Sequence, residues 1–255
     1  METTFYREYF ELEDTHWWFV GRRTILLRML DRYFGRSDDP SRRILDFGCG
    51  TGMMLEHLVR YGTAEGVEAS EEAISFCRAR GLERVQRLEH GRLPFEDGAF
   101  DLVTALDVIE HVEDDLGLLR DLRRVARPGG TLLLTVPAFP FMWGPQDEIS
   151  HHYRRYVAAG LRERISAAGW KLSRLTYFNT LLFPPIAAVR VLRPPLPPGS
   201  ELKSDLAMTP PGRLNVLLAR LFSMEAPLVE RRDLPFGVSL LAIATAGATG
   251  GSDAG

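Results

Sequence analysis

Residues 44–52, Ile-Leu-Asp-Phe-Gly-Cys-Gly-Thr-Gly, combine a short apolar strand, one carboxylate (Asp46) and a glycine-rich turn. Apolar residues at helical spacing after Met53 predict a helix over residues 53–61. Glycines let the backbone turn tightly and approach a ligand closely, because they have no Cβ. The N-terminus of the following helix adds free N–H groups and a positive dipole end. The stretch therefore predicts a nucleotide-type ligand at this turn.

The spacing of the glycines separates two such ligands. A nicotinamide dinucleotide site follows the pattern G-x-G-x-x-G, which would require a third glycine where this chain has Met53. The chain has G-x-G-x-G instead, with Asp46 two residues before Gly48. A nicotinamide cofactor is therefore the weaker interpretation. Glu68 ends a second expected strand, where an acidic residue can accept hydrogen bonds from ribose hydroxyls, with a solvated surface Glu as the alternative.

A second group of reactive side chains lies in residues 138–156, after the expected fifth strand, at the end of the sheet where ligands bind in such folds. It contains the run HHYRRY at residues 151–156. Imidazole is a suitable general base near neutral pH, so His151 or His152 is the candidate catalytic base. Adjacent residues of a regular element cannot both face one site. The alternative is that both histidines only hold the loop in place.

The composition, with 45% hydrophobic and 25% charged residues in 255, is that of a globular protein large enough for one α/β domain with an elaboration. A net charge of −3 and a pI near 6.1 argue against a nucleic acid as main partner. Two cysteines, Cys49 and Cys77, exclude a disulfide framework and favour a cytoplasmic location. We expect no signal peptide and no membrane span, because no long apolar run is present.

Alternating strands and helices predict a doubly wound, seven-stranded, mostly parallel sheet with helices on both faces. The expected strands are residues 44–47, 63–68, 85–90, 100–107, 131–136, 170–178 and 236–246. Helices are expected over residues 53–61, 71–80 and 158–168. A further helix is expected to open at residues 108–112 and to end before the Arg-Pro-Gly-Gly of residues 127–130. The predicted domains are an N-terminal helical cap (1–36), a core (37–178 and 233–247), a helical insert (179–232) and a flexible tail (248–255).

The runs LPFEDGAFDLVTALDVIEHVEDD and LLRDLRRVARPGGTLLLTVP, after ILDFGCGTG, resemble motifs of the class I S-adenosylmethionine-dependent methyltransferases in order and spacing. The resemblance implies a Rossmann-like methyltransferase fold and S-adenosylmethionine as cofactor. The glycine loop would line the methionine moiety, Glu68 the ribose and Glu89 the adenine, while Leu106 and Asp107 would face the sulfonium. The predicted cofactor-binding residues are Arg22, Asp46, Gly48, Cys49, Gly50, Gly52, Glu68, Ala69, Glu89, Leu106 and Asp107.

A narrower similarity is to the coenzyme-Q-type O-methyltransferases, which carry a Trp-Trp pair, then Arg, and an E-x-x-E-H stretch after strand four. The corresponding residues here are Asp107, Glu110 and His111, a trio that in some relatives binds a divalent ion. We expect no metal in this chain, with Glu110 and His111 instead capping the start of a helix. The same similarity favours His151 over His152 as the base.

The predicted function is methyl transfer from S-adenosylmethionine to a small acceptor, lipophilic if the apolar insert forms its wall, with oxygen favoured as the methylated atom. The alternative is a non-catalytic cofactor-binding module with a regulatory or assembly role. The insert also leaves open a homodimer contact or a peripheral contact with a membrane surface.

Overall fold

The computed structural model describes residues 3–89, 92–192 and 212–247. The expected adenine turn at residues 89–91 lies partly outside these ranges, and the proline-rich run at 193–198 and the tail at 248–255 lie wholly outside them.

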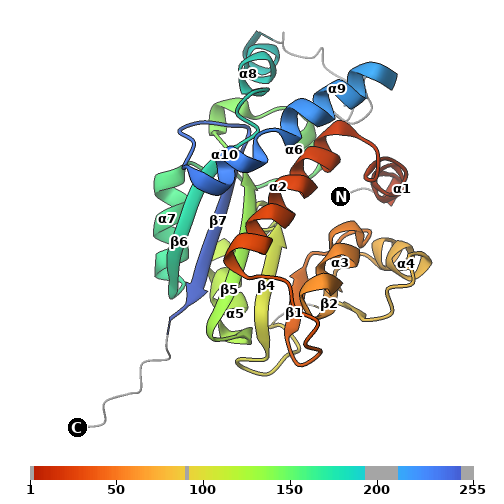
Figure 1. Ribbon diagram of the computed structural model, residues 1–255, viewed down its shortest axis with the longest axis vertical. Helices are drawn as coiled ribbons and strands as arrows, with labels where there is room; N and C mark the ends of the chain where they lie inside the picture. The colour runs from red at the N-terminus through yellow and green to blue at the C-terminus, as the bar shows by residue number, and fades with distance from the viewer. Residues whose placement is uncertain (1–2, 90–91, 193–211, 248–255) are drawn as a thin grey trace.

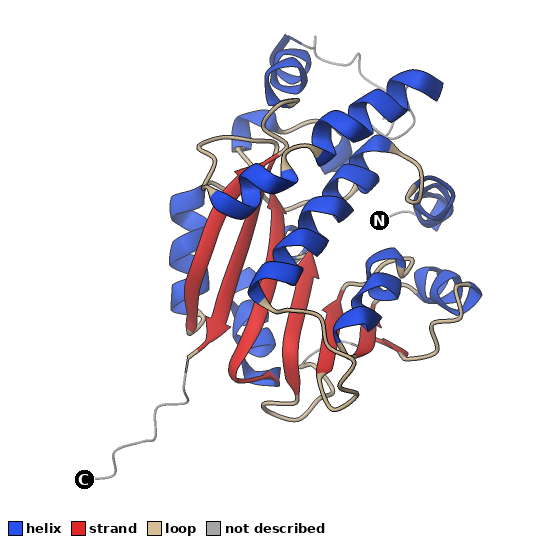
Figure 2. Ribbon diagram, viewed as in Figure 1, coloured by secondary structure: helices blue, strands red, loops and turns tan. Residues whose placement is uncertain are grey.

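The described strands form one sheet with the order β3-β2-β1-β4-β5-β7-β6, in which only β7 is antiparallel to its neighbours (Figure 2). The predicted seven-stranded, mostly parallel fold is therefore confirmed. The strands are β1 (Arg43–Phe47), β2 (Thr63–Glu68), β3 (Val85–Arg87), β4 (Phe100–Leu106), β5 (Ala126–Pro137), β6 (Trp170–Phe178) and β7 (Ser239–Ala246).

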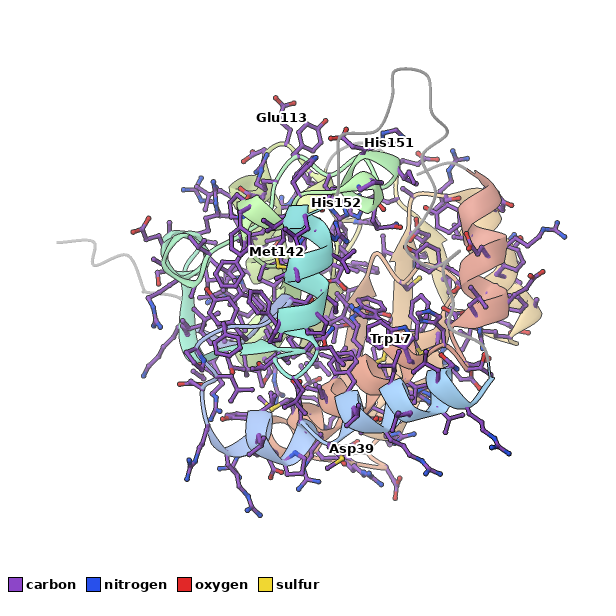
Figure 3. All side chains as sticks on the ribbon, turned by 90° about the horizontal axis from the view of Figure 1, so that it is seen from above. Trp17, Asp39, Glu113, Met142, His151 and His152 are labelled. Atoms are coloured by element: carbon purple, nitrogen blue, oxygen red, sulfur yellow. The ribbon has the colours of Figure 1, made fainter. Side chains whose placement is uncertain are left out.

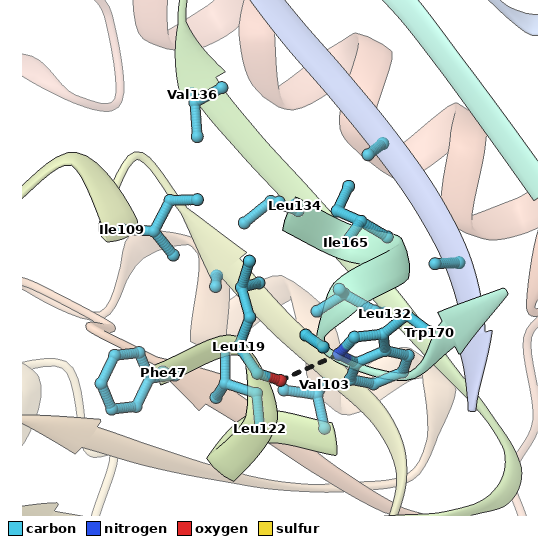
Figure 4. Close-up of a cluster of buried hydrophobic side chains, with 14 of the residues drawn as sticks. Phe47, Val103, Ile109, Leu119, Leu122, Leu132, Leu134, Val136, Ile165 and Trp170 are labelled. Carbon is cyan, nitrogen blue, oxygen red and sulfur yellow. Dashed lines mark hydrogen bonds between the residues drawn. The ribbon is translucent and has the colours of Figure 1, made fainter. Parts of the chain in front are cut away.

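Two helical layers cover the sheet, and the side chains of one strand alternate between them (Figure 1). Leu45 and Leu132 face α5 (Asp115–Val125) and α7 (Ala158–Ala167), whereas Ile44 and Leu133 face α2 (Trp17–Tyr33). In the first layer the indole Nε1 of Trp170 donates to the carbonyl of Leu119 at 3.0 Å (Figure 4). Both faces of the sheet are thus buried, as a parallel sheet requires.

The N-terminal cap and the insert pack against each other. Helix α9 (Gly212–Ser223) lies alongside α2, and α10 (Ala226–Arg231) continues the same layer (Figure 1). A Cβ on Gly21 of α2 would overlap the ring of Phe222 on α9, so the close approach of the two helices requires glycine there. The remaining helices are α1 (Thr3–Leu12), α3 (Met53–Leu58), α4 (Glu71–Ala79), α6 (Pro145–Ile149) and α8 (Phe183–Leu192), with single 3₁₀ turns η1 (Val59–Tyr61), η2 (Ile109–His111) and η3 (Pro140–Met142).

The expected helix opening at residues 108–112 is wrong. A separate 3₁₀ turn, η2, stands there, and α5 begins only after Asp114, whose carboxylate accepts the backbone N–H of Gly117 at 2.8 Å. Strand β5 begins at Ala126, five residues earlier than expected, because Ala126 pairs with Phe100 across an irregularity in the β4–β5 register. Strand β3 ends at Arg87 and β7 begins at Ser239, so both are shorter than expected. Within the described ranges, no helix has the length and apolar character needed to cross a membrane.

Candidate active site

A cavity of about 840 Å³ lies where β1, β2, β4 and β5 end, and side chains of α1, α2 and α8 also line it. This is the edge of a doubly wound sheet at which ligands bind. A further hollow of about 560 Å³ beside α5 contains none of the predicted site residues. The large cavity is lined by most of them, namely Arg22, Asp46, Gly48, Cys49, Gly50, Glu68, Ala69, Leu106, Asp107 and His152.

The glycine loop after β1 is shaped for close approach. Gly50 has φ +56°, and a Cβ there would meet nothing within 4 Å, so this part of the loop opens into the cavity. Gly48 has φ +69°, and its Cβ would clash with Val108 at 2.6 Å. Gly52, also predicted as a ligand contact, does not line the cavity, because its Cβ position faces Leu82 and Cys77. Its role is the turn into α3.

Glu68 connects the end of β2 to the glycine loop. Its carboxylate accepts backbone N–H groups from Gly50 at 2.9 Å, Ala69 at 2.8 Å and Ser70 at 3.0 Å. Three donors hold the side chain in one orientation at the cavity wall, so its remaining lone pairs have a fixed direction. Glu89, the predicted adenine contact, is exposed and does not line the cavity, whereas its neighbour Leu88 does.

Asp46 is a buried carboxylate with half of its hydrogen-bonding capacity unused. Its Oδ1 accepts the Thr104 hydroxyl at 2.5 Å, and its Oδ2 has no partner. Burial raises the pKa of Asp46 to about 7, against the hydrogen bond from Thr104. The unpartnered oxygen is available to a donor on a ligand.

Arg22 lies on α2 with its guanidinium buried at the cavity wall. Nη2 is 2.7 Å from Oδ2 of Asp107 and 3.1 Å from the Thr135 hydroxyl, and the guanidinium carbon lies 5.1 Å from the ring centre of Trp18. Asp107 itself has φ +60° at the end of β4. Arg22 thus forms an ion pair with Asp107 and also lines the cavity. The sequence did not indicate this contact, because the two residues are far apart in the chain.

The two adjacent histidines differ in position. His151 has φ +54°, is exposed and does not line the cavity, whereas His152 does (Figure 3). Nδ1 of His152 lies 2.8 Å from Oδ1 of Asp147. The preference for His151 by motif matching is therefore not supported by the geometry, and His152 is the histidine that faces the site.

Asp147 of α6 is fully buried and collects donors from several elements. It accepts hydrogen bonds from Arg155 Nε at 2.8 Å and from the Gly144 N–H at 2.8 Å, and Arg190 Nη1 of α8 lies at 3.4 Å. The His152 hydrogen bond and these cationic and backbone donors outweigh burial and lower the pKa of Asp147 to about 2. A carboxylate that stays charged fixes Nδ1 of His152 as the donor, which leaves Nε2 as the other ring nitrogen.

The predicted trio Asp107, Glu110 and His111 is not the set that the described residues gather, and Asp107 pairs with Arg22 instead. The residues brought together are Glu110, His111 and His152, whose ligand atoms all lie within 4.8 Å of one another. The expected capping role of Glu110 and His111 is also wrong, since neither caps η2 and Asp114 caps α5. Burial raises the pKa of Glu110 and lowers that of His111 to about 4.

Known proteins share part of this sequence and the fold. Residues 45–134 match the sequence model of a methyltransferase domain family. The chain contains a class I methyltransferase domain. Norajmaline N-methyltransferase of Rauvolfia serpentina is 35% identical over 129 residues, covering 45% of this chain and 44% of the relative. A ubiquinone biosynthesis O-methyltransferase of Xanthomonas oryzae is 33% identical over 147 residues, covering 50% of this chain and 62% of the relative.

Solved structures share the fold of the methyltransferase domain and of the elements around it. A methyltransferase in complex with the Trm112 activator of Haloferax volcanii superposes with a TM-score of 0.58 at 21% identity, covering 94% of this chain and 93% of that one. The [4+2]-cyclase SpnF has a TM-score of 0.55 at 21% identity, covering 89% and 81%. Because a cyclase shares this fold, the fold alone does not specify methyl transfer. The matched relatives are covered only in part, with about 44–62% of their length aligned to this chain.

Several cavity residues outside the motifs of the methyltransferase domain were not predicted. His16 lines the cavity and caps α2, accepting the N–H of Trp18 through Nδ1 at 3.3 Å, while its Nε2 is buried without a partner. Glu13 bonds the Thr51 hydroxyl at 2.6 Å and pairs with Arg80 at 2.6 Å, which anchors the end of α1 to the glycine loop. Only the aromatic crowding of residues 5–19 pointed to this segment.

Proposed function

We propose that this chain transfers the methyl group of S-adenosylmethionine to an oxygen atom of a small lipophilic acceptor. One observation carries the proposal: the motif loop with Glu68 and the imidazole of His152 open into the same cavity, together with apolar side chains of the insert. A binding module without catalysis would require neither the imidazole nor the apolar side chains of the insert.

The cofactor would lie at the end of the cavity formed by β1, β2 and β4. Gly50 leaves room for a close ligand, and Glu68 presents a fixed carboxylate suited to ribose hydroxyls. The unpartnered Oδ2 of Asp46 suits a donor on the amino acid moiety, and the Arg22 guanidinium suits its carboxylate. A cavity of about 840 Å³ lies towards the upper end of the range for small-molecule sites, which leaves space for an acceptor.

The acceptor would lie against the insert. This wall is apolar and comes from helices α8 and α9 and the chain before α8, so it favours a lipophilic ring or chain over a polar acceptor. The apolar residues concerned are Leu182, Pro185, Ile186, Val189 and Leu218. At the C-terminal end of α8, Val191 and Leu192 are exposed by 62% and 79%. We therefore keep a peripheral membrane contact as part of the proposal, which flotation with anionic vesicles tests.

Methyl transfer breaks the sulfonium C–S bond, whose electrons go to sulfur, and forms a C–O bond to the acceptor. Alignment of the two molecules can supply about 7–11 kcal/mol of the barrier. The hydroxyl proton must leave, and in the ion-free protein Nε2 of His152 is the candidate acceptor, because Asp147 fixes the other ring nitrogen. The proposed location is the cytoplasm, since Cys49 and Cys77 are both free and buried.

The test has a binding arm and a turnover arm. Calorimetry with S-adenosylmethionine and S-adenosylhomocysteine should show binding, whereas NAD should give no heat. Release of S-adenosylhomocysteine should follow addition of a phenolic, quinol or lipid-like acceptor and exceed release with amines. Binding without turnover on any acceptor would support the non-catalytic module. Absence of binding would overturn the whole proposal.

A further inference from the structure

Glu110 is a buried carboxylate with no visible partner for either oxygen. Its side chain is fully buried, and neither Oε1 nor Oε2 has a hydrogen-bond partner among the described residues. Buried polar groups are almost always paired, because an unpaired one costs free energy on folding. Glu110 lines the cavity, and so do His111 and His152. A group that the protein leaves unpaired at a cavity wall points to a ligand that pairs with it.

The two neighbouring imidazoles lie against each other, and one of them is held from behind. Nδ1 of His152 is engaged by the buried Asp147 at 2.8 Å, and the ring of His111 lies edge-on to the ring of His152, with 4.5 Å between the ring centres. His152 therefore has one ring nitrogen committed to an acceptor and the other one left over. Carboxylates and backbone carbonyls behind imidazoles are the usual supports of metal-ligating histidines, because they fix the tautomer and the ring direction.

Asp107 is withheld from this cluster. Its Oδ2 forms the 2.7 Å ion pair with Arg22, and its Oδ1 accepts the Thr135 hydroxyl at 3.1 Å. A guanidinium so close to a carboxylate competes with any cation for it. The ligand set offered by this chain therefore differs from the Asp107, Glu110, His111 trio that the coenzyme-Q-type similarity implies.

We propose that Glu110, His111 and His152 form a three-ligand site for a divalent transition-metal ion, with Zn²⁺ as the expected occupant. Two imidazoles and one carboxylate are a set that suits Zn²⁺, whereas Mg²⁺ prefers oxygen ligands alone. Ligand atoms around a tetrahedral zinc lie about 3.3 Å apart. The three atoms here are within 4.8 Å, so modest side-chain rotations close the site.

The inference deepens the proposed function at its acceptor end. A bound ion of this kind supplies a Lewis acid with an open position. Nε2 of His152 would then be a ligand, and the ion would lower the pKa of an acceptor hydroxyl at its open position, so that the hydroxyl proton would pass to water. Metal binding itself does not depend on methyl transfer, so it is tested separately.

The experiment measures metal content and affinity in the untagged full chain. After equilibration with Zn²⁺ and dialysis, elemental analysis should find about one zinc per chain, and excess Mg²⁺ should not displace it. Glu110→Gln and His152→Asn should each weaken the affinity, read by competition with a chromophoric chelator, by more than about tenfold. Replacing Zn²⁺ with Co²⁺ should give visible absorption bands that both variants lose.

Two control variants sharpen the result. His151→Asn changes an exposed neighbouring imidazole and should keep the zinc affinity of the parent chain. Asp107→Asn should also keep it, because Asp107 is not a ligand in this proposal. Equal zinc affinity in Glu110→Gln and the parent, or a loss in Asp107→Asn as large as in Glu110→Gln, would overturn the ligand set. Thermal melts check that each variant is folded.

Calorimetry with S-adenosylmethionine on the same samples separates the two proposals. Cofactor binding without specific zinc overturns only the metal site. Specific zinc binding without cofactor binding overturns only the proposed function.

Discussion

Asp147 holds His152 from behind, with Oδ1 and Nδ1 2.8 Å apart, and the same carboxylate is reached by Arg190 from the insert at 3.4 Å. Asp147→Asn keeps the shape of the side chain but removes its charge, so the direction of the imidazole is no longer fixed. We expect turnover to fall about 10- to 100-fold while S-adenosylmethionine affinity stays within twofold of the parent.

The matched control is Asp115→Asn. Asp115 is also buried and pairs with Arg154 at 2.9 Å and Arg164 at 2.7 Å, but its side-chain partners do not include His152. This variant should lose stability and keep turnover per folded molecule. If Asp147→Asn retains parental turnover, the orienting role of Asp147 is excluded.

Gly50 provides a test of the cofactor end. Gly50→Ala places a methyl group in the open part of the cavity and forces alanine to φ +56°. Gly81→Ala imposes a similar strain at φ +78°, also with nothing within 4 Å, after α4 and outside the cavity. Both variants should lose about 1–2 kcal/mol of stability. Calorimetry should show that S-adenosylmethionine binds at least tenfold more weakly to Gly50→Ala and with parental affinity to Gly81→Ala. Equal losses of affinity in the two variants would mean that Gly50 only shapes the backbone turn and does not contact the cofactor.

Asp46 predicts a pH dependence of stability. Burial raises its pKa to about 7 in the folded chain, so between about pH 4 and pH 7 the folded chain holds a proton that the unfolded chain has lost. Stability from this group therefore falls as pH rises through that window. Asp46→Asn cannot titrate, so its free energy of unfolding relative to the parent should rise by about 2–3 kcal/mol from pH 5 to pH 8.

Urea titrations at each pH, without cofactor, give the comparison. Asp101→Asn serves as a control, because Asp101 is buried at the other end of the sheet and pairs with Arg127 at 2.7 Å. A difference between Asp46→Asn and the parent that stays constant with pH would contradict the raised pKa of Asp46.

The contact between Gly21 and Phe222 predicts a steric effect. Gly21→Ala should destabilise the protein by about 1–3 kcal/mol, because the added methyl group overlaps the Phe222 ring and the packed layer cannot absorb it. Phe222→Leu should partly rescue Gly21→Ala, which a double-mutant cycle measured by thermal unfolding detects. Additive effects of the two substitutions would show that the helices do not meet at this point.

Local patterns were enough to predict most of the sheet. Strands β2 and β6 have the expected bounds, and α4 begins at Glu71 as expected, with Ser70 before it accepting the Ala73 N–H at 3.3 Å. These features depend on neighbours in the chain. The position of α5 was missed because its N-cap is Asp114, whereas the helix was expected to open at residues 108–112 with Glu110 and His111 as caps.

The site was predicted less completely, because its decisive contacts join distant residues. No residue near Asp107 in the sequence indicates that Asp107 forms an ion pair with Arg22. This ion pair makes Asp107 unavailable to the expected metal trio. The choice between His151 and His152 depends on Asp147, which holds one ring and leaves the other in solvent. Motif matching cannot see a one-residue shift of this kind.

The interlocked α2 and α9 have a consequence for protein engineering. A hybrid that borrows the insert of a relative to change acceptor preference would bring a new side chain against Gly21. Residues 1–36 and 179–232 are therefore best transplanted together, as a single exchangeable cassette on an unchanged sheet.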